Sequence, residues 1–302
     1  MIDRVRGRER TLSLPYFLIP IGGSRMELQE KDGVYFYRSE LLPCPHGFST
    51  RIGGVSTLKH TKTLNLAYGR GDDDGIVLEN LSCFANAVGV EPQSVISLPQ
   101  VHGTEVLSVT REHRGEGYIS KTDRTADGYC TVERGVTLGV KTADCVPILL
   151  CAVDERGTAI AVAALHAGWR GTVGEIARRG VEALTKKGIP AHRIRAAIGP
   201  AIGPCCYEVD REFRLAFLSA FGEKLVTETF GSLGAERYTA DLREINRRIL
   251  VEAGVLAENI DVSRECTACR PELFFSHRYS RGLRGTMLSV IALPHGDVGC
   301  EK

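Results

Sequence analysis

Hydrophobic residues recur along this chain with two periods, one typical of strands and one typical of helices. Alternation over residues 33–38 predicts a half-buried strand. Residues 146–153 and 158–165 are almost wholly apolar, and an Asp-Glu-Arg-Gly turn at 154–157 joins them. These two runs therefore predict a buried hairpin.

Other segments extend the same mixed pattern. Residues 43–57 are rich in Gly, Ser and Thr and are predicted to form a loop. Further strands are predicted at 95–98, 104–109, 136–140, 195–199 and 287–292. Helical spacing predicts a helix at 75–88, directly after an Asp cluster. It predicts three more helices, from the residue after Gly171 to Leu184, at 211–221 and at 242–253.

The N-terminal region faintly resembles a signal peptide, with four alternating arginines ahead of an apolar run at 12–21. Two prolines interrupt that run, two acidic residues lie among the arginines, and no small-x-small cleavage site follows. We therefore interpret it as an edge strand or an extension. Because no composition break follows, we expect an extension at 1–32 and one catalytic domain at 33–302.

Composition favours a protein that acts on small molecules. Lys and Arg total 38 against 37 Asp and Glu, so no basic stripe predicts nucleic-acid binding. No apolar run reaches the ~18 to 20 residues of a membrane span. The ten cysteines have no repeating spacing, which favours reduced thiols in a cytoplasmic protein. We expect a monomer or homodimer.

Three segments each carry one soft metal ligand: His102 in QVHG, Cys145 in TADC and His166 in LHAGWRG. Two imidazoles and a thiol are a natural ligand set for zinc, and three protein ligands leave a fourth position open. Taken alone, His102 is more simply a turn histidine, and Cys145 a small core residue. For His166 a functional role is favoured, because the predicted helix N-terminus that follows it favours anions.

Polar neighbours extend this candidate site. Arg51 and Arg170 are candidate cations for a phosphate or carboxylate, although a loop arginine such as Arg51 is as readily a solvated one. Asn65 would contact substrate or cap a turn. Cys266 and Cys269 form an isolated CxxC, a weak zinc or redox signal, and Cys205 with Cys206 fits loop packing better than a site.

The motifs together resemble a known family. Seven segments are similar, in their order along the chain, to the laccase-domain family, the YfiH-type group also called polyphenol oxidase-like or peptidoglycan editing factor. They are HGFSTRIGGVST, QVHGTEV, ADGYCT, VKTADCVPILL, LHAGWRGTVGEIA, AIGPAIGPCCYEV and CTACRPELFFSHR. The similarity runs from His46 to Arg278. One departure is Ser276–Arg281, where the family has a tyrosine followed by paired arginines.

The resemblance implies an α+β (mixed α/β) fold, a single-domain sandwich of mixed β-sheets flanked by helices. It implies a mononuclear Zn²⁺ site on His102, Cys145 and His166. The implied reactions are phosphorolysis of adenosine, inosine, guanosine and methylthioadenosine, and deamination of adenosine. Substrate contacts are expected from Arg51, Asn65, Asp144 and Arg170, with purine nucleoside and phosphate as the bound molecules.

Two other chemistries compete for the same residues. A metal-independent cysteine hydrolase would use Cys145 as nucleophile and a histidine as base. A multicopper oxidase would need about ten histidine ligands, largely in His-x-His pairs. The chain has eight histidines and no two are separated by one residue. Phenol oxidation would thus need Cu²⁺ in the three-ligand site. A further alternative, a role in peptidoglycan editing, rests on the family label alone.

Overall fold

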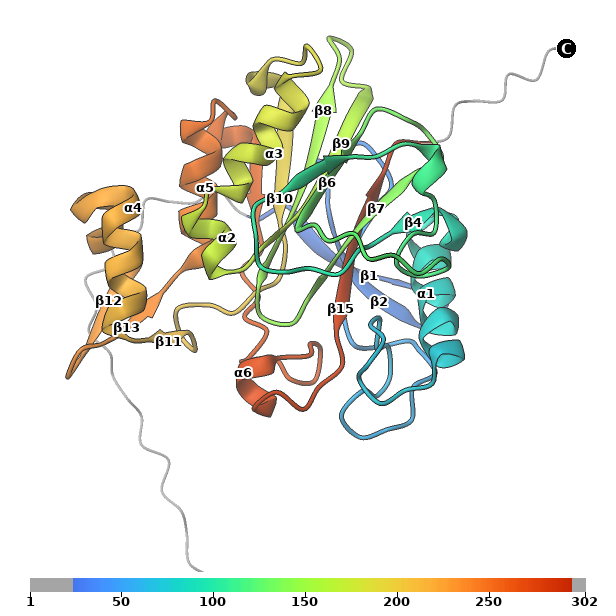
Figure 1. The fold of residues 1–302 in the computed structure, drawn as a ribbon, viewed down its shortest axis with the longest axis horizontal. Helices are drawn as coiled ribbons and strands as arrows, with labels where there is room; N and C mark the ends of the chain where they lie inside the picture. The colour runs from blue at the N-terminus through green and yellow to red at the C-terminus, as the bar shows by residue number, and fades with distance from the viewer. Residues whose placement is uncertain (1–23, 295–302) are drawn as a thin grey trace, which may run out of the picture.

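The computed structural model describes residues 24–294, which form a four-layer sandwich of two mixed sheets between helices (Figure 1). This confirms the predicted fold class. The apolar run at 12–21, interpreted as an edge strand or extension, lies outside the described residues. The first sheet has the order β1 (Met26–Lys31), β2 (Val34–Ser39), β3 (His46–Ser49), β15 (Met287–Ala292), β7 (Thr137–Thr142) and β4 (Val95–Ile96).

The second sheet contains the predicted hairpin at its centre. Its order is β14 (Ile260–Val262), β10 (Ile194–Ile198), β8 (Val146–Val153), β9 (Ala159–Ala167), β6 (Gly128–Thr131) and β5 (Val106–Ser108). Strands β8 and β9 are apolar on both faces because both faces are covered. Along β8, Ile148 and Leu150 pack toward the helices, whereas Leu149 and Cys151 pack between the sheets.

Helices cover the two outer faces. α1 (Asp74–Val88) packs Leu81 and Phe84 against the first sheet. On the second sheet lie α2 (Trp169–Val173), α3 (Ile176–Thr185), α4 (Arg211–Thr229) and α5 (Leu242–Glu252) (Figure 1). A small sheet of β11 (Glu208–Val209), β13 (Arg237–Ala240) and β12 (Phe230–Gly234) lies beside α4, and α6 (His277–Ser280) precedes β15.

Three predicted segments differ from the structure by more than two residues. The helix predicted at 211–221 continues past Gly222, whose φ of 77° marks a kink, to Thr229. The helix predicted after Gly171 is two helices, because Glu175 adopts a left-handed conformation that separates α2 from α3. The predicted loop at 43–57 contains β3, whose four residues are all buried and pair with β2 and β15. Their short sequence shows no alternation, so tertiary pairing decides this strand.

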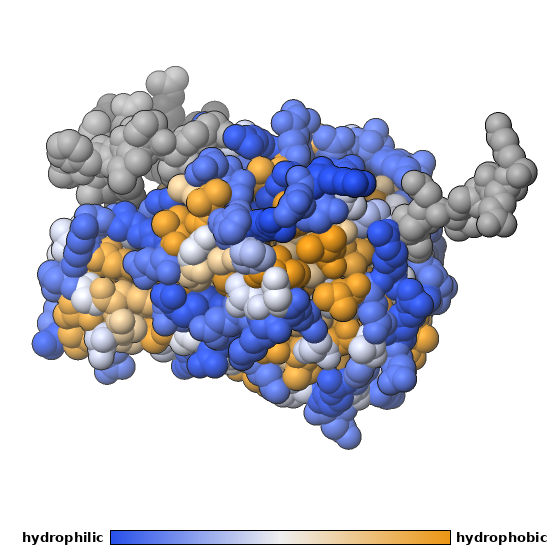
Figure 2. Space-filling model, turned by 90° about the horizontal axis from the view of Figure 1, so that it is seen from above, coloured by the Kyte–Doolittle hydropathy of each residue, from blue (hydrophilic) through white to orange (hydrophobic). Residues whose placement is uncertain are grey.

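The surface is mixed in polarity. On the face in Figure 2, hydrophobic patches are interspersed among hydrophilic side chains. The large exposed hydrophobic residues come from separate elements, such as Leu28 of β1 and Leu215 of α4. Among residues 24–294, no helix combines the length and apolar character needed to cross a bilayer.

Candidate metal centre and its relatives

Strand pairing brings Cys145 and His166 together. Cys145 immediately precedes β8, and His166 is the penultimate residue of β9. The antiparallel register aligns Pro147 with His166 and Val146 with Ala167. The hairpin predicted from the apolar runs therefore places the thiol and this imidazole at the same end of the sheet.

The third ligand comes from a loop beside the same strand ends. His102 lies between β4 and β5 and has a positive φ of 59°. Its Nε2 lies 3.9 Å from the Sγ of Cys145, and its ring is 4.9 Å from that of His166. The three ligand atoms lie within 4.8 Å of one another, so the structure brings all three predicted ligands into one group that could hold a metal ion.

Asp127 holds two of these candidate ligands in place and is a candidate functional residue that the sequence analysis missed. It precedes β6, and the β6–β9 register places it beside His166. Its Oδ1 accepts hydrogen bonds from His166 Nδ1 at 2.7 Å and from the backbone N–H of His102 at 3.0 Å. Its Oδ2 accepts backbone N–H groups of Val101 and Gly103. The only sequence signal was a carboxylate between Ala and Gly ahead of a strand.

This arrangement sets the histidine tautomer. Asp127 is fully buried, and burial would raise the pKa of its carboxyl, but hydrogen bonds from His166 and backbone amides hold that pKa below its usual range. An ionised Asp127 can only accept, so His166 Nδ1 carries a proton, and Nε2 offers its lone pair once the ring is neutral. A carboxylate behind a histidine is the usual support of a metal-ligating imidazole.

The same contacts favour ionisation of the thiol. Burial would raise the pKa of Cys145, but the positive charge of His166 and hydrogen bonds from both histidines lower it to about 6. Burial would lower the pKa of His166, whereas the Cys145 thiolate and Asp127 raise it to about 9. A thiolate at neutral pH is the form that binds a metal or attacks an electrophile.

Asp144 fixes the turn that presents Cys145. Its φ of 96° is rare for a non-glycine residue, and such strain is held in place by surrounding contacts. Its carboxylate accepts hydrogen bonds from Thr267 Oγ1 at 2.6 Å and from the backbone N–H of Arg278 at 2.7 Å. Both oxygens of this buried side chain are thus engaged within the protein.

The segment Gly168–Arg170 begins directly beside His102 and Cys145. A Cβ built on Gly168 would lie 2.7 Å from His102 Cδ2 and 3.5 Å from Cys145 Sγ, so only glycine fits there. Arg170 is exposed, and its guanidinium lies 4.3 Å from the ring centroid of Trp169. Arg170 lies in the first turn of α2, four residues after His166 in the sequence.

Arg51 and Asn65 are held by other contacts. Arg51 donates from Nε and Nη2 to the carbonyl of Lys62 and from Nη1 to that of Pro271, and it stacks on Phe275. Asn65 is fully buried and bonds Ala67, Asp72 and the backbone N–H of Thr286. In this conformation the hydrogen bonds of both side chains stabilise the loop between β3 and α1.

Arg284 is a cation near the centre that the sequence did not single out. Burial and the neighbouring Arg70 lower its pKa to about 10, while the charges of Asp144 and Cys145 oppose that shift. Its Nε is buried without a hydrogen-bond partner, whereas its Nη1 contacts Thr286. Arg284 therefore lies close enough to Asp144 and Cys145 to interact with both of their charges.

Comparison with known proteins matches this geometry to a family. A family model described as "Multi-copper polyphenol oxidoreductase laccase" matches residues 45–294. The chain belongs to this laccase-domain family. The purine nucleoside phosphorylase YlmD of Bacillus subtilis is 37% identical over 253 residues, 82% of this chain and 87% of that protein. An adenosine deaminase named RL5, from an unknown prokaryotic organism, is 37% identical over 76% of this chain and 87% of that protein.

A solved structure of the laccase-domain family has the same fold. The crystal structure of YlmD from Geobacillus stearothermophilus superposes with a TM-score of 0.81 at 35% identity, covering 90% of this chain and 100% of that one. The chain is therefore an enzyme of the laccase-domain family. The multicopper description does not suit its ligands, because eight histidines without a His-x-His pair cannot hold a blue copper and a trinuclear cluster.

Proposed function

We propose that this chain is a zinc-dependent purine nucleoside phosphorylase that also deaminates adenosine. The observation that carries the proposal is the convergence of His102, Cys145 and His166, with Asp127 holding His166 in the ligating tautomer. The names of relatives at 37% identity supply the substrate class. We propose adenosine, inosine, guanosine and methylthioadenosine for phosphorolysis, and adenosine for deamination.

The three residues fit zinc better than other common ions. Two imidazole nitrogens and one thiolate suit a borderline-soft cation such as zinc. Ions such as Mg²⁺ prefer carboxylate oxygens and would bind this ligand set poorly. Three protein ligands also leave one coordination position free for catalysis. Bound zinc would supply Lewis-acid polarisation and lower the pKa of a coordinated water.

The surrounding residues would position the substrates. We assign the phosphate subsite to Arg170 and Arg284, because one guanidinium is exposed and the other has a buried, unpartnered Nε–H. Tyr207 is the aromatic residue that we place beside the purine, because it lies near enough to Cys145 and Asp144 for their charges to act on it. Asp144, Arg51 and Asn65 would act by holding the loops that shape the pocket.

Ligand substitutions test the proposal directly. His102→Ala, Cys145→Ala and His166→Ala should each lose the metal of this centre and at least about 100-fold in turnover, while remaining folded by circular dichroism. His192→Ala, on a surface segment, is the matched control and should lose neither. Metal retained by all three variants would contradict the assigned ligands.

A cysteine hydrolase is the second candidate, because the lowered pKa of Cys145 would also suit a nucleophile. Cys145→Ser separates the two proposals. If zinc remains stoichiometric in this variant while all turnover disappears, the thiolate is the nucleophile. If zinc and turnover fall together, the thiolate is a ligand.

The phosphate subsite has its own test. Arg284→Ala and Arg170→Ala should each raise the KM for phosphate about 10-fold or more, with a much smaller change in the KM for nucleoside. Deamination, which uses water instead of phosphate, should change little. Arg156→Ala, in the exposed turn between β8 and β9, is the control. An equal loss of both reactions would instead place these arginines in nucleoside binding or in folding.

A further inference from the structure

Four cysteines that are far apart in the sequence meet beside the metal centre. Cys205 and Cys206 lie in the loop after β10, and Cys266 and Cys269 lie in the loop after β14. The Sγ of Cys269 lies 3.4 Å from that of Cys205 and 3.3 Å from that of Cys206. All four sulfurs lie within 4.8 Å of one another, and none forms a disulfide.

These distances suit a tetrahedral metal. Zinc binds cysteine thiolates at about 2.3 Å, which places the sulfurs of a tetrahedral site about 3.8 Å apart. The separations of 3.4 and 3.3 Å from Cys269 lie just below that value, and all four sulfurs lie within 4.8 Å of one another, so small side-chain movements would complete the tetrahedron. A disulfide would need a sulfur separation of about 2.05 Å and would pair only two of the four residues.

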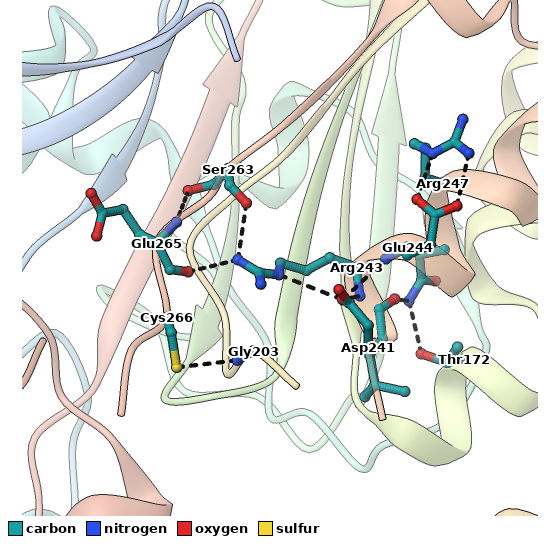
Figure 3. A network of polar contacts seen from close by, with 11 residues as sticks. Thr172, Gly203, Asp241, Arg243, Glu244, Arg247, Ser263, Glu265 and Cys266 are labelled. Atoms are coloured by element: carbon teal, nitrogen blue, oxygen red, sulfur yellow. Dashed lines mark hydrogen bonds and ion pairs between the residues drawn. The ribbon is translucent and has the colours of Figure 1, made fainter. Parts of the chain in front are cut away.

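The backbone of the two loops is already organised around the sulfurs. Ala201 and Cys266 form a parallel β-bridge, and the N–H of Gly203 donates to Cys266 Sγ at 3.2 Å (Figure 3). A Cβ on Gly203 would lie 3.4 Å from Cys205 Sγ and 2.9 Å from Arg243 Nη2. Glycine therefore permits the close approach of the two loops, with an amide directed at a sulfur.

A buried cation lies next to this cluster. Arg243 is 8% exposed, and its Nη1 donates to the carbonyls of Ser263 and Glu265, the second of which adjoins Cys266 (Figure 3). Its Nε has no hydrogen-bond partner, and the nearest carboxylate, Asp241, lies 3.7 Å away. Zinc with four thiolates has a net charge of −2, half of which a buried guanidinium would offset.

We propose that Cys205, Cys206, Cys266 and Cys269 bind a second zinc ion, distinct from the ion at His102, Cys145 and His166. Four thiolates fill the coordination of zinc, so this site is structural and takes no part in chemistry. On binding, each thiol releases its proton to solvent.

The ion would tie together two loops that both hold the turn before Cys145. Ile202 donates its N–H to the Asp144 carbonyl, and Thr267 donates its hydroxyl to the Asp144 carboxylate. The second zinc would therefore hold the geometry of the catalytic centre from outside it. This second site depends on the four cysteines alone and is independent of the activity proposed for the first centre.

The decisive experiment uses the full chain with Cys145→Ala. This variant lacks a ligand of the catalytic centre and keeps all four clustered cysteines. Elemental analysis should find one zinc per chain, down from two in the wild type, and X-ray absorption should show four sulfur neighbours at about 2.3 Å. Absence of zinc, an iron–thiolate spectrum in its place, or nitrogen and oxygen neighbours would overturn the proposal.

A complementary variant removes the second site. Cys266→Ser with Cys269→Ser should retain one zinc and lose thermal stability, while Cys83→Ser, in α1, should retain two zinc ions. Should the double variant fail to fold, the Cys145→Ala measurement still decides. A wild type that lacks zinc and has lost two hydrogen atoms by non-reducing mass spectrometry would show a disulfide and contradict the proposal. One zinc that disappears with Cys145→Ala would refute the second site and leave the catalytic proposal standing.

Discussion

At the residue scale, the carboxylate of Asp127 links two histidines that the sequence separates by 64 positions. It accepts four hydrogen bonds, one from the His166 ring and three from the backbone of 101–103. Those contacts fix both the tautomer of His166 and the unusual φ of His102. The candidate ligands could be predicted as residue types, but this supporting residue could not, because a buried aspartate has no sequence periodicity.

Asp127→Asn tests this role. The amide would present an N–H group to backbone N–H donors that now bind a carboxylate oxygen, and the charge beside His166 would be lost. We expect metal affinity at the catalytic centre to fall about 10- to 100-fold. Competition with a chromophoric chelator would measure it.

The control is Asp123→Asn, in the exposed part of the same loop. Its zinc affinity should equal that of the wild type. If Asp127→Asn also binds zinc as tightly as the wild type, Asp127 has a packing role only.

At the element scale, the sequence predicted the β8–β9 hairpin and α1 closely, because both have strong hydrophobic patterns. α5 was also predicted within one residue. The short strands β3 and β6 were missed, since four buried residues carry no alternation. The β6 omission mattered most, because pairing of β6 with β9 delivers Asp127 to the site.

The loop from β9 into α2 is also an element-scale feature, and Gly168→Ala probes it. The added methyl group would lie 2.7 Å from His102 Cδ2, so His102 or the start of α2 must move. We expect loss of zinc from the catalytic centre and of turnover, with an unchanged far-ultraviolet circular dichroism spectrum.

Gly75→Ala, where a new Cβ meets no atom within 4 Å, is the matched substitution in α1. It should keep zinc and activity. Full zinc occupancy and wild-type turnover in Gly168→Ala would show that the centre tolerates displacement of His102.

At the scale of the whole molecule, each centre is assembled by segments that only the complete fold brings together. The β8–β9 hairpin accounts for Cys145 and His166, but His102 arrives on a loop between strands of different sheets. The sequence shows the clustered cysteines only as a weak CxxC and as an adjacent pair that fits loop packing. Sequence spacing could not join them, because their proximity depends on the adjacent, parallel strands β10 and β14.

The central claim is that one metal centre serves two nucleophiles, water and phosphate, on a purine nucleoside. The most direct measurement is to incubate the zinc-loaded enzyme with adenosine, with and without phosphate, and to identify the products by chromatography and mass spectrometry. We predict inosine and ammonia without phosphate, and additionally adenine and ribose 1-phosphate when phosphate is present. Both activities should disappear in His166→Ala. Free adenine formed without phosphate would indicate a hydrolase, and no product from any purine nucleoside would contradict the proposed function.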